Sequence, residues 1–109
     1  MRTSGHHVED IYQNMEANDA CVMWGEAILK AKCRDWTIKF SPGASPEGVC
    51  ILKTQTIAIH WPDGEPDYPL MLHEIAHITA YGWGHDSAFA HEYMALVREF
   101  FVAKGAPDE

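Results

Sequence analysis

Two short runs rich in β-branched residues, separated by only three residues, constrain the fold of this chain most strongly. The runs cover residues 48–52 and 56–61, and Lys53, Thr54 and Gln55 lie between them. β-Branched side chains favour strands, and so short a connection permits only antiparallel pairing of consecutive strands. The sequence therefore predicts a β-hairpin over residues 48–61.

A third strand and a long helix are predicted ahead of the hairpin. Residues 36–40 alternate apolar and polar side chains and are followed by Ser41, Pro42 and Gly43, which indicates a strand that ends in a turn. From about residue 7 to 32, apolar residues recur at spacings of three, four and seven, which is typical of an amphipathic helix. Its apolar face comprises Val8, Ile11, Met15, Cys21, Val22, Ile28 and Leu29, and the pattern weakens locally at Asn18, Asp19 and Gly25.

Two further helices are predicted after the hairpin. The apolar stretch from Leu70 to Tyr81 follows Asp67, the expected cap, and is stopped by Gly82 and Gly84. Asp86 or Ser87 can cap a last helix that ends before Gly105 and Pro107. Its apolar stripe comprises Phe89, Tyr93, Leu96, Val97 and Phe100.

These elements predict an α+β layer structure with an N-terminal helix, a three-stranded mainly antiparallel sheet and two C-terminal helices. A length of 109 residues allows one domain, 1–109, and 47% hydrophobic content allows a packed core.

The net charge of -8 disfavours direct binding to nucleic acid. No apolar stretch reaches the roughly 20 residues of a membrane span, and the first residues lack the apolar region of a signal peptide, so we expect a cytoplasmic protein. Oligomeric state is left open.

The cysteines do not predict a disulfide framework or a zinc knuckle. Cys21, Cys33 and Cys50 are an odd set without a C-x-x-C pair, so we expect reduced and mostly buried thiols.

The segment from His73 to His77 carries the strongest chemical signal. Residues four apart lie one turn above each other on a helix, so His73 and His77 can direct two imidazoles at one metal ion. Glu74 lies beside the first histidine, where its carboxylate can reach a water molecule at the metal. This is the H-E-x-x-H arrangement of zinc hydrolases, with Glu74 as the general base.

A catalytic zinc site needs a third protein ligand. His85 is the leading candidate, because Gly82 and Gly84 allow the chain to leave the helix and return an imidazole to the open side of the pair. The rival donors are Asp86, His91 and Glu92. Asp86 has two alternative roles, as the cap of the last helix, which we favour, or as a partner of a ligand histidine. Zn²⁺ is the expected metal, although Mn, Co or Fe can occupy such a site.

The chain resembles the SprT-like zinc metallopeptidases, a group that includes proteases acting on DNA–protein crosslinks. The resemblance rests on His73-Glu74-x-x-His77, the glycine-containing loop and Gly84-His85-Asp86-x-x-Phe89, together with the strands at 48–50 and 57–59, and covers roughly residues 48–100. It implies a minimal zincin core, with His73, His77 and His85 as zinc ligands and Glu74 as general base. The chain departs from that group in having no C-terminal cysteine zinc ribbon, basic DNA-binding tail or obvious ubiquitin-family interaction segment, so the resemblance does not extend to a repair role. The sequence looks equally similar to small stand-alone metallohydrolases. The resemblance implies a protein or peptide substrate.

Substrate contacts are less strongly indicated. Tyr81, His91 and Tyr93 are the nearest candidates to stabilise an oxyanion, and Trp83 can line a substrate pocket. An extended peptide would add to an exposed sheet edge, for which residues 57–61, just ahead of the histidine helix, are the expected strand.

Two other functions fit parts of the pattern. One is a zinc hydrolase of a non-peptide bond; the endoribonuclease family of ribosomal RNA maturation also carries three histidines, but it typically lacks the glutamate found here at position 74. The other is a non-catalytic interaction module in which zinc ties the last two helices together. Replacement of Glu74 by Gln separates a hydrolase, which loses turnover and keeps its metal, from a structural site.

Overall fold

The computed structural model describes the backbone of residues 5–80 and 84–101, with side chains from residue 17 onward within these ranges. The elements, in chain order, are α1 (Gly5–Ala31), β1 (Thr37–Pro42), β2 (Glu47–Ile51), β3 (Thr56–Trp61), α2 (Tyr68–Thr79), α3 (Ser87–Leu96) and the π-helical segment η1 (Val97–Phe101). The predicted α+β fold is confirmed. None of the helices within the described ranges is long and apolar enough to cross a membrane.

The sheet is mixed, with strand order β1-β3-β2. The predicted hairpin is confirmed, because β2 pairs antiparallel with β3 and Cys50 lies opposite Ile57. β1 pairs parallel with β3 on its other side, with Ile38 opposite Ile57. One of the two strand pairs is therefore antiparallel, as expected, and the other is parallel.

The expectation that residues 57–61 form the sheet edge is wrong. β3 lies at the centre, and Ile57, Ile59 and Trp61 are fully buried. The physical reason is visible in the sequence, since a nearly continuous apolar run is typical of a strand flanked by others. β2 has alternating inward and outward residues, and it is an edge strand of this sheet.

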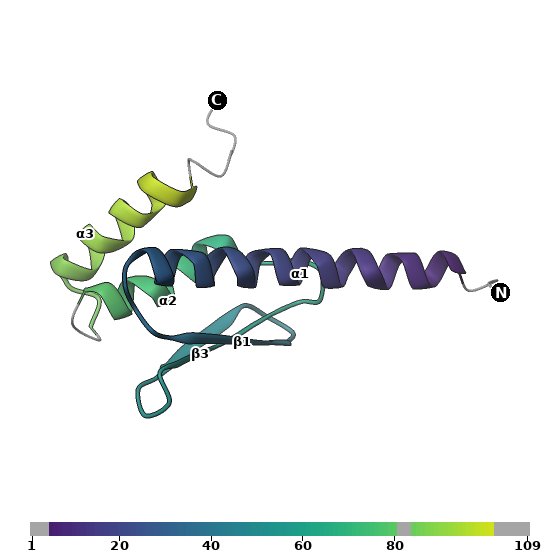
Figure 1. Ribbon diagram of the computed structural model, residues 1–109, viewed down its shortest axis with the longest axis horizontal. Helices are drawn as coiled ribbons and strands as arrows, with labels where there is room; N and C mark the ends of the chain where they lie inside the picture. Colours follow the sequence, from purple (N-terminus) through teal and green to yellow (C-terminus); the bar gives the residue numbers. More distant parts are fainter. Residues whose placement is uncertain (1–4, 81–83, 102–109) are drawn as a thin grey trace.

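Two helices cover one face of the sheet (Figure 1). α1 packs on β1 and on α2, α2 packs on β2, and α3 packs on α2 at the end of the molecule opposite the start of α1. The described part of the predicted apolar face of α1 is confirmed, because Cys21, Ile28 and Leu29 are buried and Val22 packs against the core. The side chains of Val8, Ile11 and Met15 lie outside the described residues.

The predicted helix caps are confirmed. Asp67 caps α2, with its carboxylate accepting a hydrogen bond from the backbone N–H of Leu70 at 2.9 Å. Asp86 caps α3 in the same way, accepting from the N–H of Phe89 at 3.0 Å. α2 ends at Thr79, two residues before the predicted end, and the stop signal at Gly82 and the end near Gly105 and Pro107 lie outside the described residues.

Two of the three positions that weaken the α1 pattern, Asn18 and Gly25, serve the packing of this helix. A Cβ on buried Gly25 would lie 2.6 Å from Met71 Sδ and 2.8 Å from Ile38 Cδ1, so glycine lets α1 approach α2 and β1 closely. Asn18 is 5% exposed, and its Oδ1 accepts hydrogen bonds from Trp61 Nε1 at 2.8 Å and from the N–H of Gly64 at 3.1 Å. The Asn18 amide also donates to Asp63 Oδ1 at 2.7 Å.

Replacing Asn18 by Leu is expected to destabilise the fold, because the N–H groups of Trp61 and Gly64 would lose their acceptor. We expect the free energy of unfolding to fall by about 2–4 kcal/mol. Urea denaturation followed by circular dichroism measures this, with the exposed neighbour substitution Asp19→Leu as control. Equal transition midpoints for the two variants would contradict the anchoring role of Asn18.

Candidate metal centre

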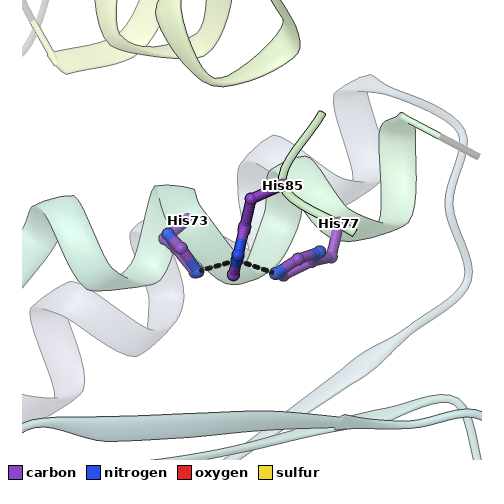
Figure 2. Close-up of side chains that lie close together, drawn as sticks. All are labelled: His73, His77 and His85. Atoms are coloured by element: carbon purple, nitrogen blue, oxygen red, sulfur yellow. Dashed lines mark hydrogen bonds between the residues drawn. The ribbon is translucent and has the colours of Figure 1, made fainter. Parts of the chain in front are cut away.

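Three histidines from two segments converge on one point. His73 and His77 lie one turn apart on α2, and His85 lies in the segment that leads into α3. The Nε2 atom of His85 is 3.2 Å from the Nε2 atoms of both His73 and His77, and Figure 2 shows its ring between the other two. The donor atoms of all three lie within 4.8 Å of one another, so the cluster can hold a metal ion.

Local structure explains why His85 lies beside His73 and His77. Asp86 caps α3, which fixes the start of that helix immediately after His85. Gly84 precedes His85. A Cβ at position 84 would meet no atom within 4 Å, so no other residue packs closely against the chain at this point. The sequence alone left Asp86, His91 and Glu92 as rival third donors. Asp86 is the cap, while His91 and Glu92 line a different hollow together with Thr79.

The donor set fits a transition-metal ion. A single N–H on His85 cannot donate to two acceptor nitrogens at once, whereas one cation satisfies three convergent lone pairs. Two of the three nitrogen pairs, both involving His85, are 3.2 Å apart, and all three donor atoms lie within 4.8 Å of one another.

Phe89 on α3 supports the cluster from one side. Its ring centroid lies 4.9 Å from that of His73, 4.6 Å from that of His77 and 4.9 Å from that of His85, and the residue is 7% exposed. The sequence predicts for Phe89 only a place in an apolar stripe and in a motif. Its contact with all three imidazoles depends on how α3 crosses α2, which local spacing does not reveal.

Glu74 and strand β2 complete the site. An open hollow of about 390 Å³ is lined by the three histidines, by Glu74 and by Gly48, Val49, Cys50 and Leu52; we call it the histidine hollow. Glu74 is only 5% exposed, and its carboxylate Oε1 accepts a hydrogen bond from the Cys50 thiol at 3.4 Å. Neither Gly48 nor Cys50 was predicted to touch this carboxylate.

The electrostatics of the hollow favour a bound cation. A buried carboxylate is unfavourable unless a positive charge or several hydrogen bonds compensate it. Within residues 17–80 and 84–101 the ion pair formed is Lys32 with Glu99, and no Lys or Arg side chain pairs with Glu74. Burial and the negative charge of Glu74 raise the pKa of the Cys50 thiol well above its usual range, so Cys50 is a protonated donor at neutral pH.

Of the residues predicted to stabilise an oxyanion or to line a substrate pocket, the structure describes His91 and Tyr93. Tyr93 lies beside the cluster, with its ring centroid 6.2 Å from that of His73, and burial together with the charge of Asp67 raises the pKa of its phenol. Tyr81, Gly82 and Trp83 lie outside the described residues. The cysteines are reduced, as expected, but Cys33 is exposed, Cys50 is half-buried and Cys21 is fully buried.

Comparison of the chain with protein-family models, with curated proteins and with solved structures gave no match.

We expect the purified protein to bind about one Zn²⁺ per chain. Removing a direct ligand should weaken binding by more than about 100-fold, because even partners of ligands contribute about 10–100-fold. Elemental mass spectrometry and chelator competition on His77→Ala and His85→Ala measure this, with His91→Ala as the matched control. Zinc kept by His85→Ala, or lost by His91→Ala, would contradict the three-histidine assignment.

Proposed function

We propose that this protein is a zinc-dependent hydrolase, most specifically a metallopeptidase of the SprT-like kind. His73, His77 and His85 would hold the metal, and Glu74 would be the general base. The observation that carries the proposal is the buried carboxylate of Glu74 in the same hollow as three convergent imidazoles. A purely structural zinc site has no use for a buried carboxylate beside its ligands that pairs with no Lys or Arg of the described residues.

The roles of the chain's own residues follow from their places. When bound, Zn²⁺ lowers the pKa of a coordinated water toward about 7 and polarises a carbonyl group. Glu74 accepts the proton of the attacking water at a carboxylate oxygen and donates it to the leaving amine. Tyr93 is the strongest of the described candidates to donate a hydrogen bond to the oxyanion, because it lies against His73 and its raised pKa keeps the phenol protonated.

A peptide substrate is favoured by the position of β2. In the described part of the chain β2 pairs only with β3, so its other edge has unpaired backbone groups. The same strand supplies Gly48, Val49 and Cys50 to the wall of the histidine hollow. An extended peptide that added to this edge would pass beside Glu74 and the three histidines.

Glu74→Gln tests the proposal. We expect cleavage of fluorescently labelled unfolded casein by the zinc-loaded protein to fall by about 10²- to 10⁴-fold, because a positioned general base contributes about that much. Zinc content and melting temperature should stay unchanged, and Glu92→Gln, on the far hollow, should retain activity.

The same experiment separates the alternatives. Hydrolysis of 4-nitrophenyl acetate that depends on Glu74, without casein cleavage, would favour a non-peptide hydrolase. Zinc binding with no Glu74-dependent turnover of either probe would overturn the hydrolase proposal in favour of a structural site.

A further inference from the structure

The side chain of Glu74 rests against strand β2 at two points. The Cys50 thiol lies 3.4 Å from Glu74 Oε1 and 3.5 Å from the Glu74 backbone oxygen. At the other point, a Cβ built on Gly48 would lie 2.9 Å from Glu74 Oε2, 2.9 Å from Cδ and 2.8 Å from Cγ. One carboxylate oxygen therefore faces a thiol, and the other faces a residue without a side chain.

Both contacts depend on the residue types present. Real Cβ atoms do not approach other heavy atoms to less than 3.0 Å, so any side chain at position 48 would displace the carboxylate. At position 50 a protonated thiol gives the buried carboxylate a hydrogen-bond donor, which an apolar side chain of similar size would not.

We propose that Gly48 and Cys50 are positioning residues that hold the Glu74 carboxylate in place in the histidine hollow. This inference rests on the proposed function, because a position for Glu74 matters only if Glu74 transfers a proton. The contacts of these two residues that carry the proposal are with Glu74, so they would act through it. Their loss should therefore reduce turnover and leave metal binding intact.

The alternation of β2 supplies a matched control. Gly48 and Cys50 point toward α2, whereas Ile51 points to the opposite face and is 40% exposed. Ile51 does not line the histidine hollow. Ile51→Ala therefore changes a side chain of the same strand that neither lines the histidine hollow nor contacts Glu74, and it leaves the backbone of the β2 edge in place.

Kinetics on the zinc-loaded full chain test the inference, with unfolded casein as the probe. We expect Gly48→Ala and Cys50→Ala to lower kcat by at least about tenfold, since small misplacements of catalytic groups have large effects. KM and zinc affinity should stay within about twofold of wild type. Cys50→Ser, which keeps a donor, should restore kcat to within about threefold, and Ile51→Ala should match wild type. Wild-type kcat in both Gly48→Ala and Cys50→Ala, or zinc lost in step with activity, would overturn the inference.

A second readout does not use turnover. In a Cys33→Ser background the exposed thiol is absent, and alkylation of Cys50 can be followed by mass spectrometry at pH 8.5. Glu74→Gln removes the negative charge beside Cys50, and Gly48→Ala displaces it, so both should speed alkylation by at least about threefold. Glu92→Gln should leave the rate unchanged. Equal rates in all four proteins would overturn the contact itself.

The two failures are distinguishable. If the wild type shows no Glu74-dependent turnover, the proposed function is overturned, and the inference with it. If the wild type turns over casein and the Gly48 and Cys50 variants match it, only the inference is overturned.

Discussion

The burial of α2 is the constraint on which the rest of this structure depends. Met71, Leu72, Ile75 and Ala76 are fully buried, and the helix packs against α1, β2 and α3. A helix fixed on several sides cannot rotate about its axis without breaking its packing. The packing of α2 in the core therefore fixes the positions of His73, His77 and Glu74. The other residues of the site, on β2 and α3 and in the segment before α3, pack against this helix.

Burial also explains why the residues of the site differ so much in exposure. His77 and Glu74 are nearly enclosed, His73 is half-buried, and His85 is exposed in the segment before α3. Two of the candidate ligands and the carboxylate thus lie on a helix packed in the core, whereas the third candidate ligand lies at the surface. Phe89 connects the two parts, because it begins the apolar stripe of α3 and contacts every imidazole.

The sequence predicts the features of this site that are local. Residues four apart share a helix face, so the pairing of His73 with His77 follows from spacing, and the caps Asp67 and Asp86 follow from side-chain chemistry near helix starts. His85 was the leading third donor because glycines precede it. The contact of Cys50 with Glu74 spans 24 residues and depends on which strand lies beside α2. The nearly continuous apolar run of β3 is typical of a strand flanked by others, but no local pattern shows that β2 is the strand beside α2.

The register of the hairpin determines which residues of β2 face Glu74. Side chains alternate between the faces of a strand, so a slip of one residue in β2 would replace Gly48 and Cys50 with outward-facing neighbours. Val49, which is 53% exposed on the opposite face, would then meet the Glu74 carboxylate with a branched side chain. The native register places Gly48 opposite Ile59 and Cys50 opposite Ile57, and both isoleucines are fully buried. The same burial that fixes β3 in the core therefore fixes which residues of β2 face Glu74.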